Sequence, residues 1–107
     1  MSDAETARRI GRELPEVEDQ SSPDFVQLRV RGKQFAWTLL ERVEPDGPRE
    51  PQLGVLAIRC TPADKQALLE SDPAKFFITE HYRNFPAILV RLANVDDDEL
   101  RELLIEG

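Results

Sequence analysis

Residues 25–40 constrain the fold more than any other part of the chain. Between residues 26 and 30, valine and leucine alternate with glutamine and arginine, which is the two-residue period of a strand with one buried face. The apolar run at residues 34–40 predicts a second strand. Gly32 lies between the two, where a tight turn needs a residue that accepts positive φ. The stretch therefore predicts an antiparallel β-hairpin.

An amphipathic helix is expected before this hairpin, over residues 2–14. Ser2 and Glu5 have the spacing of a capping box, and apolar residues recur every three or four positions. Pro15 ends the helix, because a residue that precedes proline is driven out of the helical region. Residues 16–24 are polar and are expected to form a connection without regular structure.

A third strand is predicted at residues 53–60. It follows a loop over residues 44–52, whose three prolines and lack of apolar anchors favour mobility. Thr61 and Pro62 then predict the start of a helix, since threonine caps and proline fits the first helical position. This helix is expected to run to about Glu70 and to bury Ala63, Ala67 and Leu68.

The last third of the chain is expected to add a short second turn at residues 74–77, a buried strand at residues 87–92 and a closing helix. Asp96 and Glu99 mark the start of that helix, which buries leucines at 100, 103 and 104. The order helix, three strands, helix, one or two strands, helix predicts the α+β class, with a central antiparallel sheet flanked by helices. The expected core is Val26, Leu28, Val30, Phe35, Leu56, Ile58, Leu68, Leu89, Leu100 and Leu104.

Composition limits the class of protein. A chain of 107 residues suits one domain, residues 1–107, with a core that needs no disulfides. It has one cysteine, no apolar run of membrane-spanning length and no apolar leader, so we expect a monomeric cytoplasmic protein. The net charge of −7 opposes general affinity for phosphate backbones. Residues 25–43 differ, with four basic residues and one acidic.

The sequence offers no recognised arrangement for catalysis. Motifs for phosphate-binding loops, dinucleotide binding, zinc proteases and hydrolases are absent. Cys60 and His81 could form a nucleophile and base, but a lone cysteine at a strand end is more often a buried apolar residue. The three aspartates at 96–98 are explained by helix capping, since the ligand spacing of a calcium loop is missing. We therefore expect no enzymatic activity, no metal and no cofactor.

Two surface features remain open. Phe35 and Trp37, spaced by two on a strand, form either a stacking platform for bases or, as we favour, part of the core. Arg29 and Arg31 are expected to point outward together, with Lys33 just beyond the turn. They form either an ordinary solvated face or a basic strip for phosphates.

Two segments resemble a known family. The string LRVRGKQFA at residues 28–36 resembles the [F/L]-x-V-R-G-K-x-F-A pattern of the MmcQ/YjbR family. The string FFITEHYRNFPAILVRL at residues 76–92 is similar to the segment after the middle helix in actinobacterial-type members. The resemblance covers about residues 7–106. It implies a compact α+β domain with the topology of type III secretion chaperones, no catalytic residue and, since members are commonly described as DNA-binding, a nucleic-acid partner.

If the family description holds, binding uses the basic centre of the chain. The candidate residues are Arg29, Arg31, Lys33 and Arg83, with His81 and Tyr82 as further surface candidates. Such contacts to phosphates predict weak, salt-sensitive binding that depends little on base sequence. The alternative is a protein-binding module with no nucleic-acid role, because the fold relatives bind segments of other proteins and the acidic ends of the chain suit a basic partner.

Overall fold

The computed structural model describes residues 2–22, 25–42, 47 and 49–106, and these form an α+β fold, as expected. Within these described residues, three α-helices, two 3-10 turns and six strands follow one another. The helices and turns are α1 (Ala4–Glu13), α2 (Pro62–Ser71), η1 (Glu80–Tyr82), η2 (Leu92–Asn94) and α3 (Asp97–Glu106). The strands are β1 (Val17–Asp19), β2 (Gln27–Val30), β3 (Lys33–Arg42), β4 (Arg49–Arg59), β5 (Phe76–Phe77) and β6 (Ala87–Arg91).

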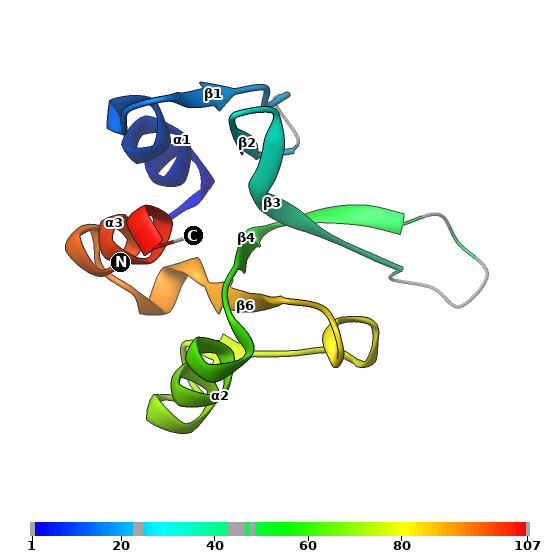
Figure 1. Ribbon diagram of the computed structural model, residues 1–107. Helices are drawn as coiled ribbons and strands as arrows, with labels where there is room; N and C mark the ends of the chain where they lie inside the picture. The colour runs from blue at the N-terminus through cyan, green and yellow to red at the C-terminus, as the bar shows by residue number, and fades with distance from the viewer. Residues whose placement is uncertain (1, 23–24, 43–46, 48, 107) are drawn as a thin grey trace.

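The strands form one antiparallel sheet in the order β1-β2-β3-β4-β6-β5, which gives the molecule two unequal faces. Figure 1 shows α1 and α3 side by side on one face, over the larger apolar cluster. No helix longer than a single turn covers the other face among the described residues; a smaller cluster forms there between the sheet and the segment around η1. Because this second face is only partly covered, some of its side chains remain available for binding.

The expected core is confirmed except at its margin. The buried members are Val26, Leu28, Phe35, Leu56, Ile58, Leu89, Leu100 and Leu104. Val30 and Leu68 are half-buried and lie against the edge of the larger cluster. Gly11 explains how closely α1 approaches this core, since a Cβ atom there would lie 2.7 Å from Leu28 Cδ1.

The first helix starts one residue later than the capping box predicts. Asp3 is the N-cap, and its Oδ1 accepts a hydrogen bond from Thr6 N at 2.8 Å. Ser2 is instead buried at the junction with α3, where its Oγ donates to Asp97 Oδ1 at 3.0 Å and its amide to Leu92 O. The carboxylate of Asp3 reaches the orphan amide, so the hydroxyl of Ser2 is free for this tertiary contact.

The connection predicted at residues 16–24 is wrong in part, because it contains β1. This strand pairs antiparallel with β2, with Glu18 opposite Arg29 and Val17 opposite Val30. Its three residues are too few for a periodic pattern to show, and two of them are acidic. Glu16 adopts φ of 64°, which turns the chain from α1 into the strand.

The loop predicted at residues 44–52 is shorter than expected, since β4 already begins at Arg49. Pro51 lies opposite Leu40 in the ladder, and the remainder of the predicted loop lies largely outside the described residues. The register shifts between Thr38, which pairs with Leu56, and Leu39, which pairs with Gln52. Beyond this irregularity β3 and β4 continue as a two-stranded arm that extends away from the body (Figure 1).

The middle helix begins as predicted but buries a different face. Thr61 Oγ1 accepts from Asp64 N at 3.1 Å, and Pro62 is the first helical residue. Ala63 and Ala67 are exposed, which corrects the expected inward face. The buried residue of α2 is Lys65, with 8% of its surface exposed.

Candidate binding face of the sheet

The β2–β3 turn presents the predicted basic residues as a tight hairpin. Arg31 and Gly32 adopt φ of 53° and 80°, so both central residues of the turn are left-handed. Arg31 and Lys33 are exposed, while Arg29 is half-buried on the second face of the sheet. The structure thus brings Arg29, Arg31 and Lys33 together at one end of the sheet.

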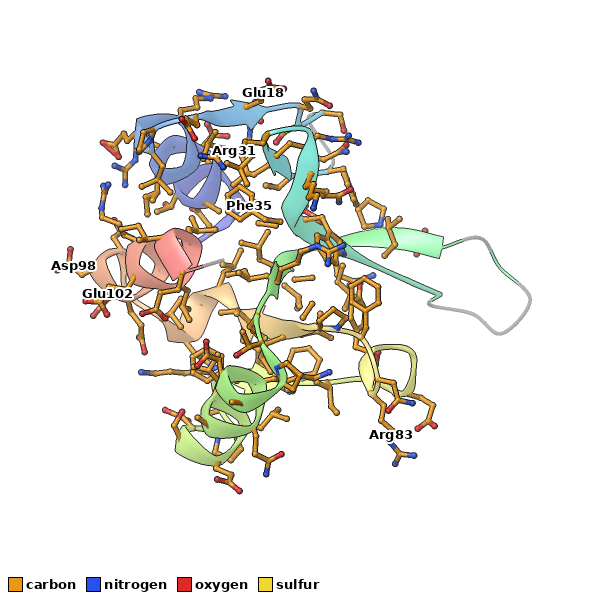
Figure 2. The ribbon with its side chains drawn as sticks, in the orientation of Figure 1. Glu18, Arg31, Phe35, Arg83, Asp98 and Glu102 are labelled. Carbon is orange, nitrogen blue, oxygen red and sulfur yellow. The ribbon has the colours of Figure 1, made fainter. Side chains whose placement is uncertain are left out.

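Acidic residues in β1 and directly before it lie next to this hairpin. Glu16 Oε2 lies 3.2 Å from Arg31 Nε, and Figure 2 shows Glu18 and Arg31 at the same end of the molecule. With its amide turned so that the oxygen faces Arg29, Gln27 accepts from Arg29 Nη2 at 2.7 Å. Part of the positive charge that the sequence predicts for this strip is therefore offset by Glu16, which directly precedes a strand that sequence reasoning missed.

Arg83 does not join the hairpin. It follows η1 near the opposite end of the molecule, far from Arg31 in Figure 2, and its Nη1 lies 3.6 Å from Glu80 Oε1. Tyr82 is buried rather than a surface residue, with 7% of its surface exposed, which corrects that expectation. The side chain of His81 lies outside what the structure describes.

The aromatic pair of β3 is divided between the two faces. Phe35 is 4% exposed and lies in the larger cluster, so it belongs to the core. Trp37 is half-buried on the second face, where its ring meets Phe85 edge to face at a centroid distance of 5.9 Å. Its Nε1 donates to Tyr82 Oη at 3.0 Å. Phe35 and Trp37 therefore do not form one platform, and Trp37 packs instead with Phe85 against the smaller cluster.

Arg59, at the end of β4, lies beside these two aromatic rings. Its guanidinium carbon lies 5.9 Å from the ring centroid of Trp37 and 5.5 Å from that of Phe85. Its Nε donates to the carbonyl of Gln34 at 2.9 Å, which fixes the guanidinium plane. Arg59 is exposed, and no carboxylate among the described residues forms an ion pair with it. Together with the rings and Gln34 it lines a pocket of about 260 Å³.

Lys65 stabilises the loop that carries two residues of this pocket, Tyr82 and Phe85. Its Nζ donates to the carbonyls of Tyr82 (2.6 Å), Arg83 (3.2 Å) and Phe85 (2.6 Å). An ammonium group has three protons, so all three are used in fixing the backbone between η1 and β6. The positions of the Tyr82 and Phe85 rings are set by this contact between α2 and the loop.

The described residues show no arrangement for metal binding, and they leave the nucleophilic pair untested. No group of three histidine, cysteine, aspartate or glutamate residues gathers among them as a metal site would require. Cys60 is half-buried, and burial raises the pKa of its thiol, so the thiolate is disfavoured. Within the same described part of the chain, no helix is long and apolar enough to cross a membrane.

Comparison with known proteins gives a family match over most of the chain. The YjbR family model matches residues 12–106. The chain belongs to the YjbR family. Among its relatives are the uncharacterized protein Rv2570 of Mycobacterium tuberculosis strain H37Rv and the uncharacterized protein Mb2600 of Mycobacterium bovis. Each is 31% identical to this YjbR-family chain over 110 residues, which cover 96% of the chain and 82% of the relative. No solved structure gives a significant match.

Sequence reasoning missed Arg59, Gln34 and Lys65. Alternation along the third predicted strand puts Arg59 on the face opposite Ile58, which was a usable signal. The contact between Arg59 and Trp37 depends on the β3–β4 register, in which Trp37 lies opposite Ala57. Nothing in the sequence near Lys65 indicates that it would be buried, because its three partners are backbone carbonyls far along the chain.

Proposed function

We propose that this YjbR-family chain is a non-enzymatic module that binds nucleic acid weakly on the second face of its sheet. Arg59 is the centre of the binding face, with Arg29 on the same face and Lys33 at its end. The single observation that carries the proposal is the state of the Arg59 guanidinium. It is exposed, lies 5.9 and 5.5 Å from the centroids of two aromatic rings and has no carboxylate partner among the described residues.

This arrangement is suited to phosphate and base contacts rather than to a structural ion pair. A guanidinium offers donors in a fixed fork that matches phosphate oxygens, and aromatic rings beside it add sequence-independent stacking. The net charge of −7 works against long-range attraction, so binding depends on contacts within about one Debye length. With three cations engaged, the slope of log affinity against log salt is expected to be about −2 for a single strand and about −3 for a duplex.

The protein-binding alternative has weaker support. The large exposed apolar side chains among the described residues are Leu40, Leu53 and Ile105. Leu40 and Leu53 belong to the β3 and β4 strands, whereas Ile105 is on α3, so they do not form one patch. Apolar side chains scattered singly over a surface are normal and need no partner.

Charge reversal at two arginines tests the proposal. Fluorescence anisotropy with a short labelled oligonucleotide, at low and moderate salt, compares the wild type with Arg59→Glu and Arg31→Glu. We expect Arg59→Glu to weaken binding by about tenfold or more, because it replaces a phosphate donor by a repelling charge. Arg31→Glu should weaken it less, since Arg31 is already paired with Glu16. Absence of wild-type binding at low salt, or an Arg59→Glu variant that binds unchanged, would exclude this function.

A further inference from the structure

We infer that the pocket beside Arg59 takes one unpaired nucleobase, so that the ligand of this face is a single strand rather than a duplex. The inference rests on the proposed function and adds the form of the nucleic acid. The pocket is lined by Gln34, Trp37, Arg59, Tyr82 and Phe85, which come from β3, β4 and the segment at η1.

The lining supplies what a base needs on its faces and its edge. A base can stack on the planes of Trp37, Phe85 and the Arg59 guanidinium, and base stacking on aromatic rings is tolerant of sequence. The side chain of Gln34 is half-buried at the pocket and brings an amide that both donates and accepts. A base in a duplex has its faces covered by its neighbours, so this chemistry is available only to an unpaired one.

Charge around the pocket agrees with this ligand. Among the described residues, Arg59 is the only charged residue in the lining, and none of their carboxylates contributes to it. The Nε of Arg59 is engaged by the Gln34 carbonyl, whereas its two Nη groups have no hydrogen bond within the described part of the chain. They are left to reach the phosphate that follows a base bound in the pocket.

The pocket is also held in shape before any ligand arrives. Trp37 Nε1 is fixed on Tyr82, and Tyr82 and Phe85 are fixed through their carbonyls by Lys65. The amide of Cys60 donates to Pro86 O at 3.0 Å, which ties the end of the loop to β4 next to Arg59. A site that is already ordered loses less conformational entropy on binding.

A neighbouring pocket of about 390 Å³ on the other side of the same loop is less suited to an anionic ligand. Its two cations are Lys65 and Arg83. All three protons of Lys65 are donated to carbonyls, and Arg83 lies beside Glu80. The space is larger, but its charges are already engaged within the protein.

The experiment compares one labelled strand with its duplex in wild type, Phe85→Leu and Phe77→Leu. Phe85→Leu removes an aromatic wall without changing the charge. Phe77→Leu is the matched control, because Phe77 stacks on Arg91 at 4.1 Å on the same sheet but outside the pocket. We expect Phe85→Leu to weaken single-strand binding roughly 5- to 100-fold, as loss of one stacked base predicts, and to leave duplex binding unchanged. The control should alter neither, and thermal unfolding of each variant checks that it is folded.

A second readout needs no variant. Trp37 is the only tryptophan in the chain, so quenching of its fluorescence reports directly on the pocket. A single strand should quench it and the duplex should not. Equal quenching by both forms, or equal affinity for both with no loss in Phe85→Leu, would overturn the inference while leaving nucleic-acid binding in place. Failure of the wild type to bind either form would instead overturn the proposed function.

Discussion

At the scale of single residues, Lys65 shows how a charged side chain is buried at acceptable cost. Taking an ammonium group out of water is unfavourable unless each of its protons finds an acceptor. Here three carbonyls of one loop converge on Nζ at 2.6 to 3.2 Å. The lysine in turn provides hydrogen-bond donors to three backbone carbonyls, and two of these belong to aromatic residues of the candidate site. The contact therefore links the stability of α2 with the shape of the pocket.

Replacing Lys65 by methionine should expose this double role. The variant keeps the length of the apolar stem but leaves the carbonyls of residues 82, 83 and 85 without their donor. We expect the free energy of unfolding to fall by about 2–4 kcal/mol. Fluorescence of Trp37 should change as well, because its indole is bonded to Tyr82.

The control is Gln66→Met, the next residue on α2, which is exposed and whose side-chain amide donates to Glu70. It should change the free energy of unfolding by less than about 0.5 kcal/mol. Urea denaturation followed by tryptophan fluorescence measures both variants. A Lys65→Met protein as stable as the control, with unchanged emission, would show that the lysine is dispensable.

At the scale of elements, Asp19 joins the short strand β1 to α1. Its Oδ2 lies 2.7 Å from Arg12 Nε and 3.5 Å from Arg8 Nε, and its Oδ1 accepts from Ser21 N at 2.9 Å. Burial alone would raise the pKa of Asp19, but the hydrogen bonds from Ser21 and Arg12 and the charge of Arg8 lower it from 3.8 to about 2. The folded state therefore favours the ionised carboxylate.

Because its pKa is lowered, the Asp19 carboxylate contributes to the stability of the fold in a way that depends on pH in one direction. This contribution is fully present above the pKa of about 3.8 that the carboxyl has in the unfolded chain, and it is lost as pH falls towards about 2. Asp19→Asn should lower the free energy of unfolding at neutral pH and should lose less of it than the wild type between about pH 5 and pH 2. Urea unfolding across this range measures it, with Asp98→Asn on α3 as a control for the lost charge. Parallel curves for Asp19→Asn and the wild type would contradict the assignment.

Long elements with a clear pattern could be predicted from the sequence, whereas short ones depend on their neighbours. The hairpin around Gly32 and the start of α2 at Pro62 follow from local rules that need no tertiary context. Strand β1 has three residues, and only its ladder with β2 defines it. The same limit explains why the candidate site could be predicted only in part. The basic residues of the hairpin were visible in the sequence, but the carboxylate beside Arg31 and the rings beside Arg59 come from other strands and loops.

At the scale of the whole molecule, charge is arranged unevenly around the sheet. Helix α3 begins with Asp97, Asp98 and Glu99 and buries its leucines against the larger cluster, on the face opposite Arg59. Figure 2 shows Asp98 and Glu102 on its outer side. Neither has an ion pair in the part of the chain that the structure describes, so both contribute to the negative field without stabilising a contact. Under the proposed function, a nucleic acid approaching Arg59 would thus be attracted at short range and repelled at long range.

Neutralising these two acids should strengthen binding only when salt is low. The double variant Asp98→Asn, Glu102→Gln is expected to raise single-strand affinity by about twofold at low salt, because two distant repulsions are removed through high-dielectric solvent. At physiological salt the Debye length is about 8 Å, so the difference from wild type should vanish. The matched comparison is Arg59→Glu, a change of two charge units at the contact itself, whose effect should persist at both salt concentrations. Anisotropy titrations of the three proteins measure this. A gain from the α3 variant that survives moderate salt would place α3 in the interface and would contradict a binding face centred on Arg59.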